Sequence, residues 1–97
     1  MSHAIYKYQI PGASTFAFAV AMPVNARILT VQAQHQAICI WAMVNTSAPM
    51  EWRYFNVFPT GWEIGDWSEG SYLATVQFLD GSYVLHVFEG SAPKPVT

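Results

Sequence analysis

The sequence of 97 residues contains little charge. Charged residues make up 10% of it, whereas a typical soluble domain has about 25%. Four Lys or Arg and six Asp or Glu give a formal net charge of −2 at pH 7. Binding to duplex nucleic acid or to an anionic membrane needs clustered basic residues, which this composition does not supply. We therefore expect neither duplex nucleic acid nor a membrane among the partners.

Cysteine and long apolar runs are equally scarce. Cys39 is the single cysteine, so it cannot form an internal disulfide, as is typical of proteins in a reducing cytoplasm. The N-terminal residues lack the apolar stretch of a secretory signal, because polar residues interrupt them and Pro11 ends the run. The longest weakly polar segment, 16–24, is far shorter than the roughly 20 residues of a membrane-spanning helix. We expect a soluble cytoplasmic protein.

Apolar residues are abundant: 53% of the chain is hydrophobic and 15% is aromatic, which excludes disorder. Apolar and polar residues alternate with a period of two, which indicates β-strands. This alternation predicts strands at 4–10, 15–22, 27–34, 37–44 and 51–58, followed by a C-terminal hairpin. A helix is the competing interpretation for 37–44, but its length and its β-branched and aromatic residues favour a central strand.

The clearest turn signal is the pair Asp80-Gly81, which favours a two-residue type I′ turn between antiparallel strands. A turn at this position sets Phe78 opposite Tyr83 and Thr75 opposite His86. Residues 59–70 contain glycines and acidic residues, and we expect them to form a long loop.

The segment 27–34 is expected to place Leu29, Val31 and Ala33 on an apolar face and polar residues on the other. Together the patterns predict an all-β fold of about seven short antiparallel strands, in a small sandwich or a partly closed barrel. A chain of this length supports one core. We expect a single β domain over 1–97, with core strands at about 4–89 and a C-terminal tail at 90–97.

No residue pattern supports catalysis or metal binding. The three histidines are scattered, and one cysteine cannot supply a thiolate cluster. Cys39 lies in a densely apolar segment, where a thiol is normally inert packing. Acidic residues in a glycine-containing loop are most often solvated: Glu63, Asp66 and Glu69. We predict that the protein is not an enzyme and uses no cofactor or metal.

Aromatic and guanidinium side chains are the binding candidates, because Trp, Tyr and Arg dominate interface hot spots and stack on planar ligands. The candidates for a ligand or interface site are Trp41, Trp52, Arg53, Tyr54, Trp62, Trp67, His86 and Arg27. Core packing is the favoured interpretation for Trp41, and a hydrogen-bonded position within a strand is favoured for His86. For Trp52, Trp62 and Trp67, packing and binding both stay open. Either arginine could clamp a carboxylate or phosphate if it faces a pocket.

Five stretches of the sequence resemble an uncharacterised family of short proteins encoded by bacteriophages and prophages. They are IYKYQIP (5–11), ILTVQAQ (28–34), ICIWAMVNTSAP (38–49), FNVFPTG (55–61) and YLATVQFLDGSYVLHVFE (72–89). The resemblance covers 4–89, although members usually carry a more turn-like pair where this chain has His35-Gln36. It implies a phage accessory or structural protein rather than a metabolic enzyme, and it assigns no functional residue.

Two functions are consistent with these features. The first is a non-enzymatic binding module in the host cytoplasm that captures a small, nucleotide-like signal or a host protein, as an antagonist of host defence would. The second is a structural component of the virion, such as a capsid decoration or tail subunit. In both cases we expect the chain to bind copies of itself or a virion protein, because outward strand faces carry Ala, Trp and Tyr where a monomer would expose them.

Overall fold

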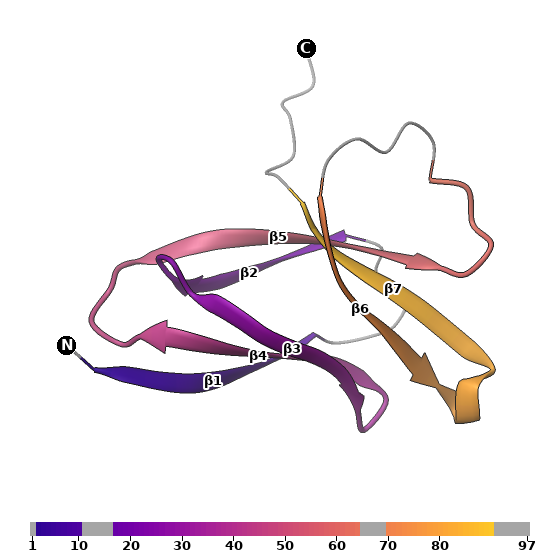
Figure 1. The fold of residues 1–97 in the computed structure, drawn as a ribbon, viewed down its shortest axis with the longest axis horizontal. Coiled ribbons are helices and arrows are strands. Elements are labelled where there is room, and N and C mark those ends of the chain that lie inside the picture. Colours follow the sequence, from indigo (N-terminus) through magenta and orange to yellow (C-terminus); the bar gives the residue numbers. More distant parts are fainter. Residues whose placement is uncertain (1, 11–16, 65–69, 91–97) are drawn as a thin grey trace, which may run out of the picture.

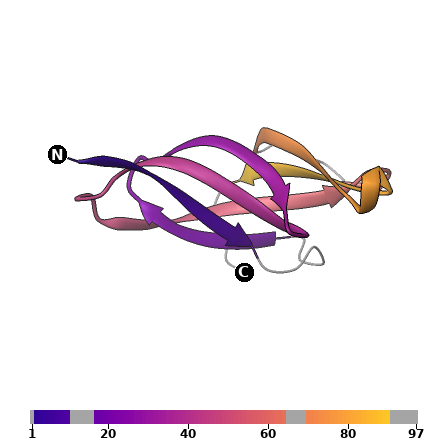
Figure 2. The same cartoon turned by 90° about the horizontal axis from the view of Figure 1, so that it is seen from below.

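The computed structural model describes residues 2–10, 17–64 and 70–90, which form an antiparallel β-sandwich (Figure 1). The strands are β1 (His3–Ile10), β2 (Ala17–Pro23), β3 (Arg27–Gln34), β4 (Ala37–Asn45), β5 (Met50–Pro59), β6 (Ser71–Phe78) and β7 (Tyr83–Gly90). One sheet has three strands in the order β1-β4-β3, and the other has four in the order β2-β5-β7-β6. Seen from below, the sheets form two layers (Figure 2). The all-β prediction is confirmed as a sandwich, and the sheets do not close into a barrel.

The core lies between the inward faces of the two sheets. Period-two alternation sends Ile38, Ile40 and Val44 of β4 inward, where each is at most 2% exposed. Phe55 of β5 meets them from the four-stranded sheet, and its ring stacks on Phe18 of β2 with 5.3 Å between centroids. As predicted, β4 is the central strand of its sheet and is apolar on both faces.

Two crossings between the sheets lie side by side at one end of the sandwich. The first joins β2 to β3, and the second joins β4 to β5. The backbone N–H of Val24 in the first crossing donates to the carbonyl of Pro49 in the second, at 2.7 Å. This bond continues the pairing of β2 with β5 by one residue and joins the two crossings.

The hairpin between β6 and β7 has the predicted register, with Phe78 opposite Tyr83 and Thr75 opposite His86. Asp80 (φ 55°, ψ 33°) and Gly81 (φ 89°) have the positive φ angles of a type I′ turn. The left-handed backbone begins one residue earlier than predicted, because Leu79 also has a positive φ (52°), and Leu79–Gly81 form the short 3₁₀ element η1. The backbone N–H of Ser82 closes the turn on the carbonyl of Leu79, at 3.1 Å.

The prediction for the face of β3 is wrong at Leu29. A β-bulge between Ile28 and Thr30 shifts the register against β4. Consequently Ile28, together with Val31 and Ala33, packs against the core, while Leu29 is 43% exposed. A bulge places two residues opposite one, so alternation before it cannot be extrapolated beyond it.

Some predictions fall on residues outside the described part of the chain. The start of the predicted strand at 15–22 is one, because β2 is described from Ala17. The others are residues 65–69 of the predicted loop, which include Trp67, and residues 91–97 of the predicted tail.

Candidate functional site

The outer face of the four-stranded sheet carries five aromatic side chains, which we call the aromatic face: Trp52, Tyr54, Phe58, Tyr72 and Phe88. Alternation along β5 turns Trp52, Tyr54 and Phe58 away from the core, opposite in direction to the buried Phe55 and Val57. Trp52 is 63% exposed and Tyr72 is 59% exposed. This amount of exposed aromatic surface is the most unusual feature of the sandwich.

Three of these rings contact one another across neighbouring strands. Phe58 on β5 and Phe88 on β7 are 6.0 Å apart between centroids, and Phe88 and Tyr72 on β6 are 5.6 Å apart. Both contacts are edge-to-face, a geometry that aromatic pairs favour. The rings therefore support each other in fixed orientations and form a continuous apolar surface over three strands.

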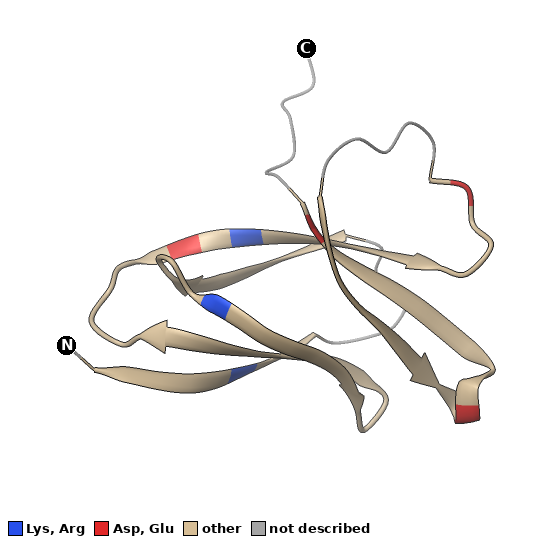
Figure 3. Cartoon of the chain, in the orientation of Figure 1, with Lys and Arg blue, Asp and Glu red and all other residues tan. Residues whose placement is uncertain are grey.

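No charged side chain lies on this outer face within the described strands. The outward positions are Ala17, Ala19, Ala21, Pro23, Met50, Trp52, Tyr54, Asn56, Phe58, Tyr72, Thr75, Gln77, Val84, His86, Phe88 and Gly90. Charged residues are few on the strands of this sheet (Figure 3), and they are Glu51, Arg53 and Glu89. Their register partners are Met22, Val20 and Phe55 on the inward side.

A chain of side-chain hydrogen bonds crosses the aromatic face from β6 to the end of β5. The hydroxyls of Tyr72 and Thr75 are 2.8 Å apart, and the Thr75 hydroxyl is 3.0 Å from Nδ1 of His86. Nε2 of His86 lies 2.7 Å from the Thr60 hydroxyl. Both ring nitrogens of His86 are thus held by hydroxyl groups, and none of these partners is the carboxylate that orients a catalytic histidine in Ser-His-Asp sites. The predicted hydrogen-bonded position within a strand is confirmed for His86.

Arg53 does not contribute to the aromatic face. Its guanidinium donates to both carboxylate oxygens of Glu89, with Nη2 to Oε1 at 3.0 Å. Nη1 also donates to the carbonyl of Ala26 at 2.8 Å. The hydrogen bond to Glu89 raises the pKa of Arg53 further above its usual range, although burial opposes this change. Arg53 is therefore a structural tie at the end of the core, with three of its N–H groups bonded within the chain.

Other predicted site residues lie on the opposite sheet. The half-buried Trp41 is on the outer face of the three-stranded sheet, where Nζ of Lys7 lies 5.8 Å from its ring centroid. Lys7 also donates to Oε1 of Gln34 at 2.5 Å, which spans the sheet from β1 to β3. Between these strands, on the same face, Cys39 is completely buried. Cys39 is thus buried packing, as predicted.

Arg27 lies on the other sheet, and Trp62 lies beyond the end of β5. Arg27 is exposed at the start of β3, beside a pocket of about 360 Å³ that His3 and Asn45 also line. Trp62 follows the end of β5 and is 58% exposed. The structure thus unites Trp52, Tyr54 and His86 of the predicted set on one face, and it places Trp41, Arg27 and Arg53 elsewhere.

Sequence reasoning missed three members of the aromatic face, namely Phe58, Tyr72 and Phe88. The alternation within β5 and the hairpin register were sufficient to find Phe58 and Phe88. The outward position of Tyr72 could not be predicted in this way, because a β-bulge between Tyr72 and Ala74 turns its side chain to the outer face.

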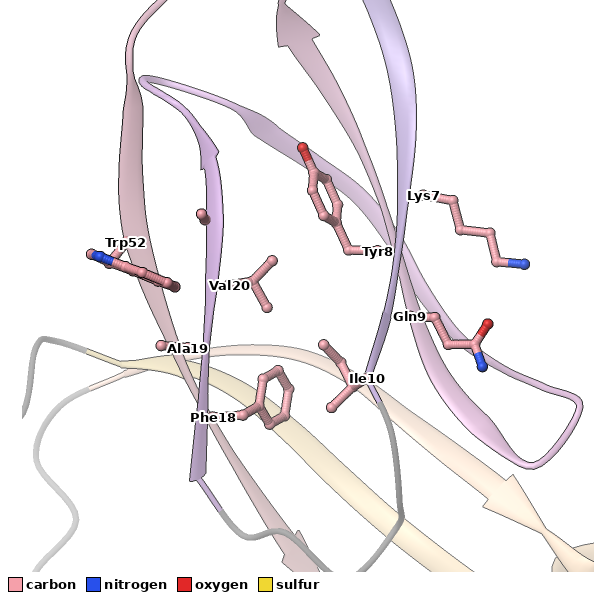
Figure 4. A pocket seen from close by; sticks show the side chains of 9 residues that line it. Lys7, Tyr8, Gln9, Ile10, Phe18, Ala19, Val20 and Trp52 are labelled. Carbon is pink, nitrogen blue, oxygen red and sulfur yellow. The ribbon is translucent and has the colours of Figure 1, made fainter.

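A second hollow lies between β1 and β2, the edge strands of the two sheets (Figure 4). It has a volume of about 680 Å³. Tyr8, Ile10, Phe18 and Val20 point into it, whereas Trp52 lies on the far side of β2. The Tyr8 hydroxyl is shielded from solvent and has no partner among the described residues. Burial, and to a lesser degree the neighbouring Tyr6, raises the pKa of Tyr8.

Two classes of site are absent from the described residues. No three His, Cys, Asp or Glu side chains in this part of the chain come together to hold a metal ion. No helix there has the length and apolar character to cross a membrane.

Comparison with known proteins places the chain in a family. Over residues 1–97 it matches the family described as Domain of unknown function (DUF7352). The chain belongs to this family. The match spans the described and undescribed residues alike, which confirms the prediction of an uncharacterised family in this coarser form. No curated protein and no solved structure matches this DUF7352 chain.

Proposed function

We propose that the chain is a non-enzymatic binding module whose aromatic face holds a protein partner through an apolar patch on that partner. The observation that carries this proposal is an outer sheet face whose described strand positions carry no charged side chain, and on which Trp52 and Tyr72 are 63% and 59% exposed. Large exposed apolar patches on soluble domains mark interaction sites. Tyrosine and tryptophan are also the residues that most often dominate binding energy at protein interfaces.

The same geometry favours a protein over a nucleotide-like ligand. A bound phosphate needs a cation or a set of backbone donors, but Arg53 points to the core and is paired with Glu89. Sites for small molecules are concave, whereas the aromatic face lies on the outside of a sheet. A flat apolar patch on a protein surface satisfies this face without leaving a buried charge unpaired.

We further propose that the module is encoded by a phage, acts in the host cytoplasm on a host protein, and forms a homo-oligomer. The resemblance to phage and prophage proteins supports the first two points, and the low charge of the outer surfaces supports the third. The alternative is a virion component whose aromatic face is covered by neighbouring subunits. Mass spectrometry of purified virions separates the two, since many copies per particle contradict the cytoplasmic module.

The test of the aromatic face is a matched set of variants. The double variant Trp52→Ala, Tyr72→Ala removes the two most exposed rings of the face. The control, Ile5→Ala, removes an apolar side chain of 56% exposure from the outer face of the other sheet. All three proteins are used to capture partners from host cells, and a captured partner is then purified and its affinity for each protein is measured.

We expect the purified partner to bind the wild type and the control equally, and the double variant at least about 100-fold more weakly, since each hot-spot truncation removes about 2 kcal/mol. Circular dichroism and melting curves must show that the variants are folded. Equal binding by all three proteins, or a nucleotide bound in native mass spectra and lost in the double variant, contradicts the proposal.

A further inference from the structure

β2 is an edge strand of the four-stranded sheet, so the backbone groups that do not bond to its neighbour β5 can be assigned. The backbone N–H of Val24 donates to the carbonyl of Pro49, and the same register runs along β2 and β5, with Met22 opposite Glu51. Because hydrogen-bonded pairs alternate in an antiparallel ladder, even-numbered residues of β2 direct their peptide groups to β5. The odd-numbered residues direct theirs to the free edge: Ala17, Ala19, Ala21 and Pro23. Pro23 has no N–H, which is consistent with this assignment, because at an odd-numbered position the ladder with β5 loses no hydrogen bond.

Two of the other three edges of the sandwich carry features that hinder pairing with another chain, and the third carries a charged residue. β3 and β6 each contain a β-bulge, and bulges twist an edge away from a partner strand. On β1, the same ladder argument places Lys7 at the free edge, since the N–H of Thr46 donates to the carbonyl of Ser2. Lysine is a common guard of exposed edges, but the ammonium of Lys7 reaches across the outer face to Gln34 on β3, so this charge lies beside the edge rather than on it. β2 has no charged residue and no register shift.

The sequence of β2 is close to symmetric about Val20. Small residues flank it at 19 and 21, large apolar residues follow at 18 and 22, and Ala17 is matched by Pro23 at the ends. A strand with this order presents the same profile when it is turned end to end. Such self-complementarity is the requirement for an interface between two identical chains related by a two-fold axis.

We propose that the free edge of β2 pairs with the same edge of a second copy of this chain, antiparallel and with the two-fold axis at Val20. In this register the N–H of Ala19 donates to the carbonyl of the partner's Ala21, and the N–H of Ala21 donates to that of the partner's Ala19. The two four-stranded sheets then continue into each other. On the inward side, the half-buried Val20 meets the partner's Val20, and Phe18 lies opposite the partner's Met22, beside the hollow between β1 and β2 (Figure 4).

This inference names the contact of the homo-oligomer and rests on that part of the proposed function, but it uses a different surface from the aromatic face. Its readout is the mass in solution, measured by sedimentation equilibrium from low to high micromolar protein. Ala19→Pro removes a donor at the free edge and leaves the ladder with β5 intact. Ala19→Lys places a charge there, and the control Gln77→Lys places the same charge on the bulged edge strand β6 of the same sheet.

We expect a dimer for the wild type and for Gln77→Lys. Dimerisation of Ala19→Pro and Ala19→Lys should be weaker by at least about tenfold, because each change acts twice across the axis. Hydrogen exchange adds a residue-level readout: the amides of Ala19 and Ala21 should exchange more slowly as protein concentration rises, while the amide of Val20, bonded within the chain, should not change.

Three results overturn the inference. The first is a monomer at every concentration. The second is a dimer that both Ala19 variants leave unchanged, which places the contact on another surface. The third is protection of the Ala19 and Ala21 amides in the monomer, which means that another segment of the same chain covers the edge. A dimer that persists in the double variant Trp52→Ala, Tyr72→Ala shows that this contact and the aromatic face are separate surfaces. Either proposal can then be refuted while the other still holds.

Discussion

The ion pair between Arg53 and Glu89 should contribute to stability far more than an ordinary surface pair. The guanidinium contacts both carboxylate oxygens, and it also donates to the carbonyl of Ala26 just before β3. The two side chains are only 18% and 23% exposed. The pair therefore joins β5 to β7 within the four-stranded sheet. Through Ala26, Arg53 also joins this sheet to the crossing from β2 to β3, which leads into the three-stranded sheet.

The size of the effect follows from this partial burial. Removing one partner of a fully buried pair destabilises a protein by about 3–5 kcal/mol, whereas exposed pairs contribute about 0–1 kcal/mol. With about a fifth of each side chain exposed, we expect Glu89→Ala to lower the free energy of unfolding by about 2 kcal/mol. Arg53→Met keeps the aliphatic stem but leaves Ala26 without its donor, so we expect a loss of about 3 kcal/mol.

Urea denaturation of the two single variants and the double variant, at one protein concentration, gives the coupling energy. We expect a coupling of about 1.5 kcal/mol. The control is Glu63→Ala, which removes an exposed carboxylate and should change stability by less than about 0.5 kcal/mol. A coupling below about 0.5 kcal/mol would show that the pair behaves as a solvated surface contact and would refute the reasoning.

Three further predictions concern single sites. His35 and Gln36 both have positive φ angles, 52° and 64°, so changing the pair to Asn-Gly should raise the free energy of unfolding by about 1 kcal/mol in urea titrations. Tyr8→Phe removes a shielded hydroxyl without a described partner and should stabilise by about 1 kcal/mol at neutral pH. Because burial raises the pKa of Tyr8, the unfolded chain loses that proton first, and wild-type stability should fall above about pH 10 more steeply than that of Tyr8→Phe. Leu29→Ser should be neutral within about 0.5 kcal/mol, whereas Ile28→Ser should cost at least about 2 kcal/mol; the reverse order in thermal melts would contradict the bulge in β3.

The strands could be predicted from the sequence because their signals are local. Alternation along 37–44 and the pair Asp80-Gly81 each determine a structure within a few residues, and the structure has both. The bulges could not be predicted, because they depend on how a strand fits its neighbour. For this reason Leu29 was assigned to the wrong face, and Tyr72 was not recognised as part of the aromatic face.

The candidate site was only partly predictable for a related reason. Alternation alone separates Trp52 and Tyr54 from Arg53, and this separation holds in the structure. The partner of Arg53 depends on β5 pairing with β7, which places Glu89 opposite Phe55 although the two are distant in the sequence. Pairing between distant strands leaves no local pattern, so the role of Arg53 as a tie emerges only from the fold.

Because Cys39 is buried, the rate at which its thiol is labelled can be used to measure the opening of the three-stranded sheet. The thiol lies at the centre of the three-stranded sheet and is completely buried, so a thiol reagent reaches it only when β4 separates from a neighbouring strand or from what covers it. The labelling rate, compared with the rate for the unfolded chain, therefore reports the free energy of that opening. If this energy equals the global free energy of unfolding, the two sheets open as one cooperative unit. If it is smaller, the three-stranded sheet opens on its own while the aromatic face and its supporting strands stay folded.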